Sequence, residues 1–374
     1  MIKPNRKDLI FTLVFLISSI ALVFIPTGFE RDIYYNAVGA EALVLETDES
    51  TVIQTGLFRQ GEQRCRVRIL TGEHKGYEGD AVNLLSGSLK DDKMFIPGEK
   101  AWTLVERDGD DNVIFINMID HYRLSKEIVL ALILVSALIA FSKLRGARTI
   151  LSFVFAFLLI WKILIPLTLK GYNPLLVSSA VLIAMTIFTL LLISGVNRRA
   201  LAAILGSVSA VILTFIISKA MTSYLGIHGS VLEQSESLLY SGFMDLDLTS
   251  LFSGVVILSA GGAIMDLSID VSAAMWEVKE HAKSITGREL FKSGMEVGRA
   301  GVGTQCTTLL LAYMGSFLTV MMVYMAQSTP ILNILTSKSI ASEILQTVVG
   351  ALSLILVTPL TCIFASFIFK KKEN

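Results

Sequence analysis

The feature that most constrains this chain is a series of eight apolar blocks, each near the length that crosses a lipid bilayer. A helix needs about 20 residues for this, and the blocks cover 9–25, 127–143, 149–168, 174–194, 200–218, 248–270, 302–325 and 341–368. Of the 374 residues, 53% are hydrophobic and 17% are charged, whereas soluble domains carry about 25% charged residues. We therefore expect a polytopic α-helical membrane protein, embedded in the lipid bilayer, with about eight transmembrane helices.

The first block can be a cleaved signal peptide or a retained anchor. Lys3, Arg6 and Lys7 precede it, and a basic start is compatible with both. The segment after it, Ile25–Phe29, lacks the small-x-small pattern of a cleavage site. We interpret residues 1–29 as a retained transmembrane anchor.

Residues 30–123 differ in composition from the apolar blocks. They include 18 acidic and 11 basic residues, and short runs of alternating polar and apolar residues lie between glycine-rich turns. In the run 63–70, three arginines alternate with Cys65, Val67 and Ile69, so one face is charged and the other apolar. Similar short runs occur at 42–45, 100–105 and 112–116. Five or six short strands predict a small β-barrel-like domain of the OB or SH3 type.

The basic residues near the ends of the blocks predict the topology, because cytoplasmic loops are enriched in lysine and arginine. With the N-terminus inside, the cytoplasmic loops carry Lys143, Arg145, Arg148, Arg198, Arg199, Lys279, Lys283, Arg288, Lys292, Arg299 and Lys370–Lys372. The opposite loops carry Lys170, Lys219, Lys338, Glu233, Glu236, Asp245 and Asp247. We expect a bacterial cell (inner) membrane protein with both termini cytoplasmic, an extracytoplasmic domain at 30–123 and a seven-helix membrane domain at 124–374.

Residues 277–299 are too polar to cross a membrane, and the same topology places them in the cytoplasm. Thr286 and Glu289 have the spacing of a helix capping box. Leu290, Phe291 and Gly294 share one helical face, which predicts an amphipathic helix lying against the inner leaflet.

Composition argues against several classes of site. The three cysteines and four histidines are scattered, without the spacing of a metal site. The net charge is zero, so there is no basic field for nucleic acid. We expect no metal, no cofactor and no nucleic-acid partner.

The strongest candidate for chemistry is Asp266, with Asp270 four residues further on. The i, i+4 spacing points both side chains the same way from one helix, with Asp266 somewhat past the middle of the bilayer. A carboxylate in hydrocarbon is costly and therefore suggests function: a proton carrier, a cation ligand or the partner of a donor. For Asp270, a solvated helix end is an equal alternative. Gly261 and Gly262 predict close helix approach or a helix break.

The block that begins at residue 302 has a small, polar face. Such a face suits an ion cavity, hydrogen bonds to Asp266, or simple packing between helices. The candidate cavity-lining or packing residues, besides Gly261 and Gly262, are Gly303, Thr304, Gln305, Thr307, Thr308, Tyr313 and Ser316.

Segments 261–266 (GGAIMD), 303–316 (GTQCTTLLLAYMGS), 72–77 (GEHKGY) and 83–87 (NLLSG) resemble the YibE/F family of bacterial membrane proteins. The resemblance covers nearly the whole chain and implies a multi-pass, permease-like protein without implying a substrate. The order of elements over 255–318 is also similar to the proton-relay region of the resistance-nodulation-division and SecD/SecF transporters. That similarity favours proton coupling.

These observations predict a permease or secondary transporter of a small solute or ion, coupled to protons or cations through Asp266, acting alone, as a homo-oligomer or with a partner membrane subunit. The alternative is a non-transporting assembly or regulatory protein that acts through its outer domain. An intramembrane hydrolase needs two acids that face each other from different helices, and no other block shows a clear mid-membrane acid. We therefore do not expect an enzyme.

Overall fold

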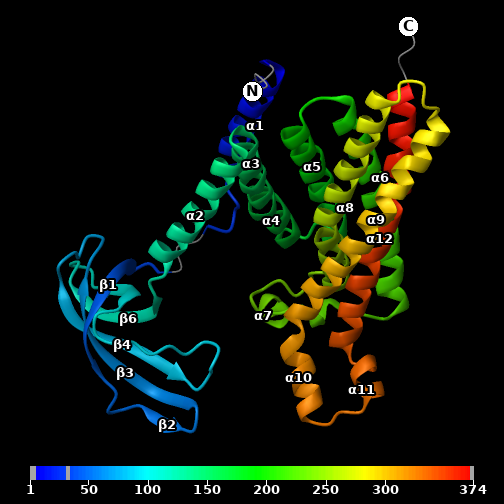
Figure 1. The fold of residues 1–374 in the computed structure, drawn as a ribbon. Coiled ribbons are helices and arrows are strands. Elements are labelled where there is room, and N and C mark those ends of the chain that lie inside the picture. The colour runs from blue at the N-terminus through cyan, green and yellow to red at the C-terminus, as the bar shows by residue number, and fades with distance from the viewer. Residues whose placement is uncertain (1–5, 31–33, 371–374) are drawn as a thin grey trace. The chain divides into compact units, whose positions relative to one another are not determined.

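The protein was analysed as a computed structural model that describes residues 6–30 and 34–370. The chain forms two compact units, each visible in Figure 1. The barrel unit runs from Glu30 to Ala137, and the helical unit takes in the chain up to Phe29 and from Leu138 onward.

The barrel unit contains six strands that form one sheet in the order β1-β5-β6-β4-β3-β2, and β1 also pairs with β3. This extra pairing closes five strands into a barrel, with β2 as an extension. All pairs are antiparallel except β4 with β6, as in an OB-type barrel. The expected small β-barrel is confirmed. The strands are β1 (Ala37–Asp48), β2 (Ile53–Thr55), β3 (Phe58–Ile69), β4 (Glu78–Ser86), β5 (Lys100–Arg107) and β6 (Val113–His121).

The barrel interior follows the alternation in the sequence. Cys65, Val67 and Ile69 of β3 are at most 2% exposed, and the arginines between them face outward. Burial raises the pKa of the Cys65 thiol to about 11, so Cys65 is a packing residue. A buried amide completes the interior: Gln63 donates to the Phe95 carbonyl at 2.8 Å and accepts from the Phe95 amide at 3.0 Å.

The helical elements begin with α1 (Arg6–Val23) and α2 (Leu124–Ser142), and α2 crosses the boundary between the two units. The helical unit continues with α3 (Leu144–Leu159), a π-helix (Ile160–Leu164), α4 (Ile165–Leu169), α5 (Pro174–Ser194), α6 (Arg198–Tyr224), a 3-10 turn (Gly229–Val231), α7 (Ser235–Tyr240), α8 (Leu248–His281), α9 (Gly287–Ser316), α10 (Leu318–Ala326), α11 (Ile331–Thr336) and α12 (Lys338–Lys370).

Within the described residues, six helices are long and apolar enough to cross a membrane, with the run α3 to α4 counted as one. The number rises to seven if α9 and α10, bent by 58° at Phe317, form one span. The helices identify a membrane protein, and the finer expectation of about eight spans stays a prediction. In α1, the shorter apolar stretch Thr12–Val23 is the remaining candidate.

The region expected to hold a separate amphipathic helix at 277–299 is organised differently. Residues up to His281 extend α8, and α9 runs without a break from Gly287 to Ser316. The capping box of Thr286 and Glu289 is confirmed. The first half of α9 does not lie apart, because its glycines let it pack closely against α8 and α12. A Cβ on Gly294 would be 2.4 Å from Met275 Sδ.

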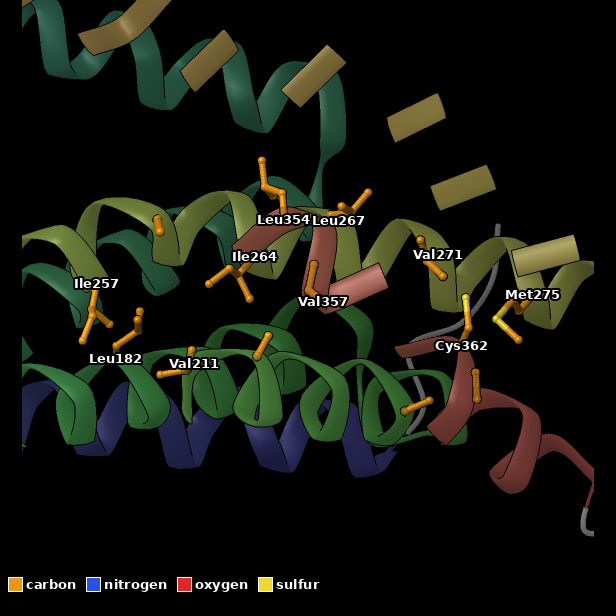
Figure 2. Close-up of a cluster of buried hydrophobic side chains, with 14 of the residues drawn as sticks. Leu182, Val211, Ile257, Ile264, Leu267, Val271, Met275, Leu354, Val357 and Cys362 are labelled. Atoms are coloured by element: carbon orange, nitrogen blue, oxygen red, sulfur yellow. The ribbon is translucent and has the colours of Figure 1, made fainter. Parts of the chain in front are cut away.

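Helix α8 lies at the centre of the helical unit and packs against α5, α6, α9 and α12. Its buried side chains form a stripe at Ile257, Ile264, Leu267, Val271 and Met275, each at most 1% exposed, which Figure 2 shows among residues of the neighbouring helices. The spacing of three, four or seven residues keeps one face of α8 toward the core.

Serines connect α8 to α6 inside this core. Ser268 and Ser207 share a hydrogen bond of 2.6 Å, and Ser218 donates to the Ser253 carbonyl at 3.0 Å. Small polar residues of this kind stabilise helix pairs in membranes. The core therefore holds α8 in a defined rotation, and this rotation decides where the side chains on its other face point.

Candidate functional site

The acid pair lies on the face of α8 that turns away from the core. Helix α8 begins at its N-cap, Asp247, whose carboxylate accepts from the Ser250 amide at 3.0 Å. The buried stripe occupies the opposite side of α8. Gly262, Asp266 and Asp270, which are spaced four residues apart, are therefore exposed. Helical geometry and core packing together place both carboxylates on one outward ridge.

Asp266 is near the middle of the 34-residue helix. None of the described residues forms an ion pair or a hydrogen bond with the side chain of Asp266 or of Asp270. A helix of this length is about 51 Å long, so it exceeds the roughly 30 Å of the hydrocarbon core. Asp266 is therefore an acid without a partner among the described residues, on the surface of a helix that is long and apolar enough to cross a membrane.

The two glycines before Asp266 have different roles. A Cβ on Gly261 would be 2.3 Å from Leu182 Cδ1, so Gly261 allows close contact between α8 and α5. A Cβ on Gly262 would meet no described atom within 4 Å. Gly262 thus leaves open space on the same ridge as Asp266. The helix runs through both glycines without a break.

The hydroxyl groups of α9 are mostly exposed and hydrogen bonded to the backbone of their own helix. Thr304 donates to the Gly301 carbonyl at 3.0 Å, and Thr308 donates to the Thr304 carbonyl at 3.0 Å. Thr307 bonds to Gly303 in the same way, at 3.1 Å. Gly303 is open, with no described atom within 4 Å of a Cβ built there. These residues form a second exposed polar surface, and the structure records no hydrogen bond from it to Asp266.

The other candidates of α9 face inward or bond locally. Gln305 is half-buried, and its side-chain carbonyl oxygen is buried without a hydrogen bond from any described residue. Ser316 is exposed and donates to the Tyr313 carbonyl at 2.7 Å. The half-buried Tyr313 hydroxyl lies beside the side chains of Ser259 in α8 and Gln346 in α12. Tyr313 therefore connects three helices.

Sequence reasoning missed the residues of α12 in this polar layer. Gln346 donates to the Ser259 hydroxyl at 3.0 Å, and Glu343 is half-buried. Glu343 lies near the start of α12, so it does not contradict the expectation that no other block shows a clear mid-membrane acid. Its place near the start of a block makes it look like a helix end. The signal was its i, i+3 spacing with Gln346, which puts two polar side chains on one face of an apolar helix.

Beside this layer is a cavity of about 360 Å³ that is partly open to the surface and is lined by the end of α9, by α10 and α11, and by the first turns of α12. Its described lining is apolar except for Tyr313, Glu343 and Thr347. Asp266 and Asp270 do not line it. The structure thus holds two separate acidic features, an exposed pair on α8 and a single acid in the wall of a cavity.

One of the comparisons with known proteins agrees with the resemblance read from the sequence, over the helical part of the chain and not over segments 72–77 and 83–87 of the barrel. No curated protein and no solved structure matches the chain. The family model described as YibE/F-like protein matches residues 130–371, which include every helix from α3 to α12. The chain therefore belongs to the YibE/F-like protein family.

Proposed function

We propose that this protein is a multi-pass permease of the bacterial cell membrane that moves a small solute or ion. Transport is coupled to protons or cations through Asp266, with Asp270 as a second carboxylate. Taking α1 and the bent pair α9–α10 as spans makes eight crossings. Both termini are then cytoplasmic, and the barrel of residues 30–123 is extracytoplasmic.

The observation that supports coupling is the exposure of Asp266 in a membrane-spanning helix without a partner among the described residues. A carboxylate that faces lipid costs several kcal/mol. The outward ridge of α8 that carries Asp266 and Asp270 (the acid ridge) is therefore stabilised by water, by a bound cation or proton, or by a second membrane protein that covers it. A homo-oligomer or a partner subunit that encloses this ridge creates a polar path, to which the exposed Thr304 and Thr308 contribute hydroxyl groups.

The test is proton flux in vesicles that contain the full-length protein, with Asp266→Asn compared with wild type. Asn keeps the size of the side chain and removes the charge, so gradient-driven flux is expected to fall at least tenfold. Glu277→Gln is a matched control, because Glu277 lies on the same exposed face of α8 near its end, beside His281. Flux that is unchanged in Asp266→Asn overturns the coupling role.

A second function is favoured by the barrel unit, which exposes apolar side chains on its β2–β3 hairpin. Ile53 is 70% exposed, Leu57 78% and Phe58 52%. Exposed apolar groups of this kind mark contact surfaces, as expected of an assembly or regulatory protein that works through its outer domain. In that case deletion of residues 30–123 abolishes the cellular phenotype of the protein, and Asp266→Asn leaves it intact.

A further inference from the structure

The cavity beside α10 has an acid in its wall that the coupling role of Asp266 does not use. The chain bends by 58° between α9 and α10. The cavity of about 360 Å³ lies next to this bend and is lined by the end of α9, by α10 and α11, and by the first turns of α12. A volume of this order is within the range of small-molecule sites.

Glu343 is the one charged residue among the described residues that line the cavity. Its Oε2 atom is buried, and none of the described residues gives it a hydrogen bond. A buried acceptor without a donor costs about 1–3 kcal/mol, and more when it is charged. A positively charged occupant of the cavity offsets part of the cost of a charged Glu343, because opposite charges attract strongly across an apolar wall even without direct contact with Oε2.

The other side chains that line the cavity indicate what the uncharged part of the occupant is like. Tyr313 and Phe317 provide aromatic rings, and Met314 and Met321 provide polarizable side chains. Aromatic faces attract cations, and methionine adapts to irregular apolar shapes. Metal cations such as Ca²⁺ or Mg²⁺ need about six oxygen ligands, which this wall does not offer.

We propose that the cavity binds a monovalent organic cation with an apolar body, such as a quaternary ammonium compound, whose charge rests against Glu343. The inference that such cations are the substrates of the permease rests on the proposed function. The inference that they bind in the cavity rests only on the cavity and on Glu343.

The polar layer connects this cavity to the acid ridge of α8. Gln346 is one turn beyond Glu343 and bonds to Ser259 of α8, with the Tyr313 hydroxyl beside both. Ser259 precedes Asp266 by seven residues, which is two helical turns on one face, about 10 Å along the axis. A cation that moves Tyr313 or Gln346 therefore acts on the helix that carries Asp266.

The experiment measures binding to the full-length protein in phosphatidylcholine nanodiscs by calorimetry, with empty nanodiscs as background. The probes are benzyltrimethylammonium and neopentylbenzene, which have nearly the same shape and differ in charge. We expect saturable binding of the cation, about one per chain, and at least tenfold weaker binding in Glu343→Gln. The neutral probe binds more weakly and does not respond to the substitution. Glu277→Gln, outside the cavity, leaves cation binding unchanged.

A second variant keeps the test decisive if Glu343→Gln fails to fold. Glu343→Asp keeps the negative charge on a side chain that is one methylene shorter, and its affinity for the cation is expected to be within about fivefold of wild type. The affinity of Glu343→Ala, which has no charge, is expected to fall by more than that. Equal binding of both probes assigns the cavity to neutral apolar groups such as lipid chains and overturns the inference, as does binding no stronger than to empty nanodiscs. If the protein binds the cation but shows no coupled proton flux, the proposed function is overturned and the binding site stands. If it shows coupled proton flux but does not bind the cation, this binding site is overturned and the proposed function stands.

Discussion

Replacing Gly298 by alanine is the sharpest test of the packing around α9. Gly298 is buried against α12, where a Cβ would be 2.1 Å from Thr358 Cγ2. Gly303, five residues along the same helix, has no described atom within 4 Å of a Cβ. Both positions are helical, so the two substitutions share every effect of alanine on the helix and differ in what the new methyl group meets.

The expected magnitude follows from that difference. Carbon atoms pack best at about 3.5–4.0 Å, so the methyl group at residue 298 is about 1.5 Å too close to Thr358. Overpacking of this kind costs about 1–3 kcal/mol. Alanine in place of glycine favours a helix by about 1 kcal/mol. We expect Gly303→Ala to raise the free energy of unfolding by about 1 kcal/mol. We expect Gly298→Ala to lower it by about 0–2 kcal/mol.

Thermal denaturation of the purified full-length protein measures the contrast. For a chain region of about 200 residues, 1 kcal/mol shifts Tm by roughly 2–4 °C, so the two variants should differ by about 2–12 °C. Adding Thr358→Ser removes the obstructing methyl group and should restore most of the loss in Gly298→Ala. If Gly298→Ala melts as high as Gly303→Ala, or if Thr358→Ser has no effect on it, the contact between α9 and α12 is not as described.

Two further predictions concern the barrel unit and are read from hydrogen exchange of the β3 and β4 amides in the full-length protein. Gln63→Ala leaves two backbone groups of Phe95 unpaired and should lower the protection free energy by about 2–4 kcal/mol; unchanged protection contradicts the buried network. The backbone amide of Ser86, with the Ser86 hydroxyl and the Gly87 amide, holds the pKa of Asp92 below its ordinary value. Because the folded pKa is the lower one, this stabilisation is complete above the ordinary aspartate pKa of about 3.9 and is lost as pH falls through the folded value. Asp92→Asn should therefore be less protected than wild type at pH 7, with the gap closing below about pH 4; a gap that is constant with pH refutes the assignment.

Much of this fold could be predicted from local pattern because each element reports its own environment. The block 174–194 coincides with α5, which begins at Pro174 after its Asn173 cap and ends before Gly195. The alternation in β3 correctly separated inward Cys65 from outward arginines. Strand β4 was missed as a strand, because its inward-facing positions include the polar Asn83, which interrupts the apolar alternation.

The candidate site was predictable only in part. Asp266 stands out in an apolar block, and its i, i+4 relation to Asp270 follows from the helix. Glu343 did not stand out, because it lies near the start of α12, where an acid usually meets water. Only the tertiary structure, in which α9, α10, α11 and α12 together line a cavity, shows that this acid is half-buried in the helical unit.

The sequence by itself determined that this chain is a membrane protein with a small barrel, since hydropathy and alternation are local and strong. It also determined that Asp266 and Asp270 share one face of one helix. Only the tertiary structure decided which way that face points, because the rotation of α8 depends on the serines and glycines of α5, α6 and α9 that pack against it. The same packing decided that Gly261 is a contact and Gly262 is open, and that Glu343, Tyr313, Gln346 and Ser259 meet in one layer.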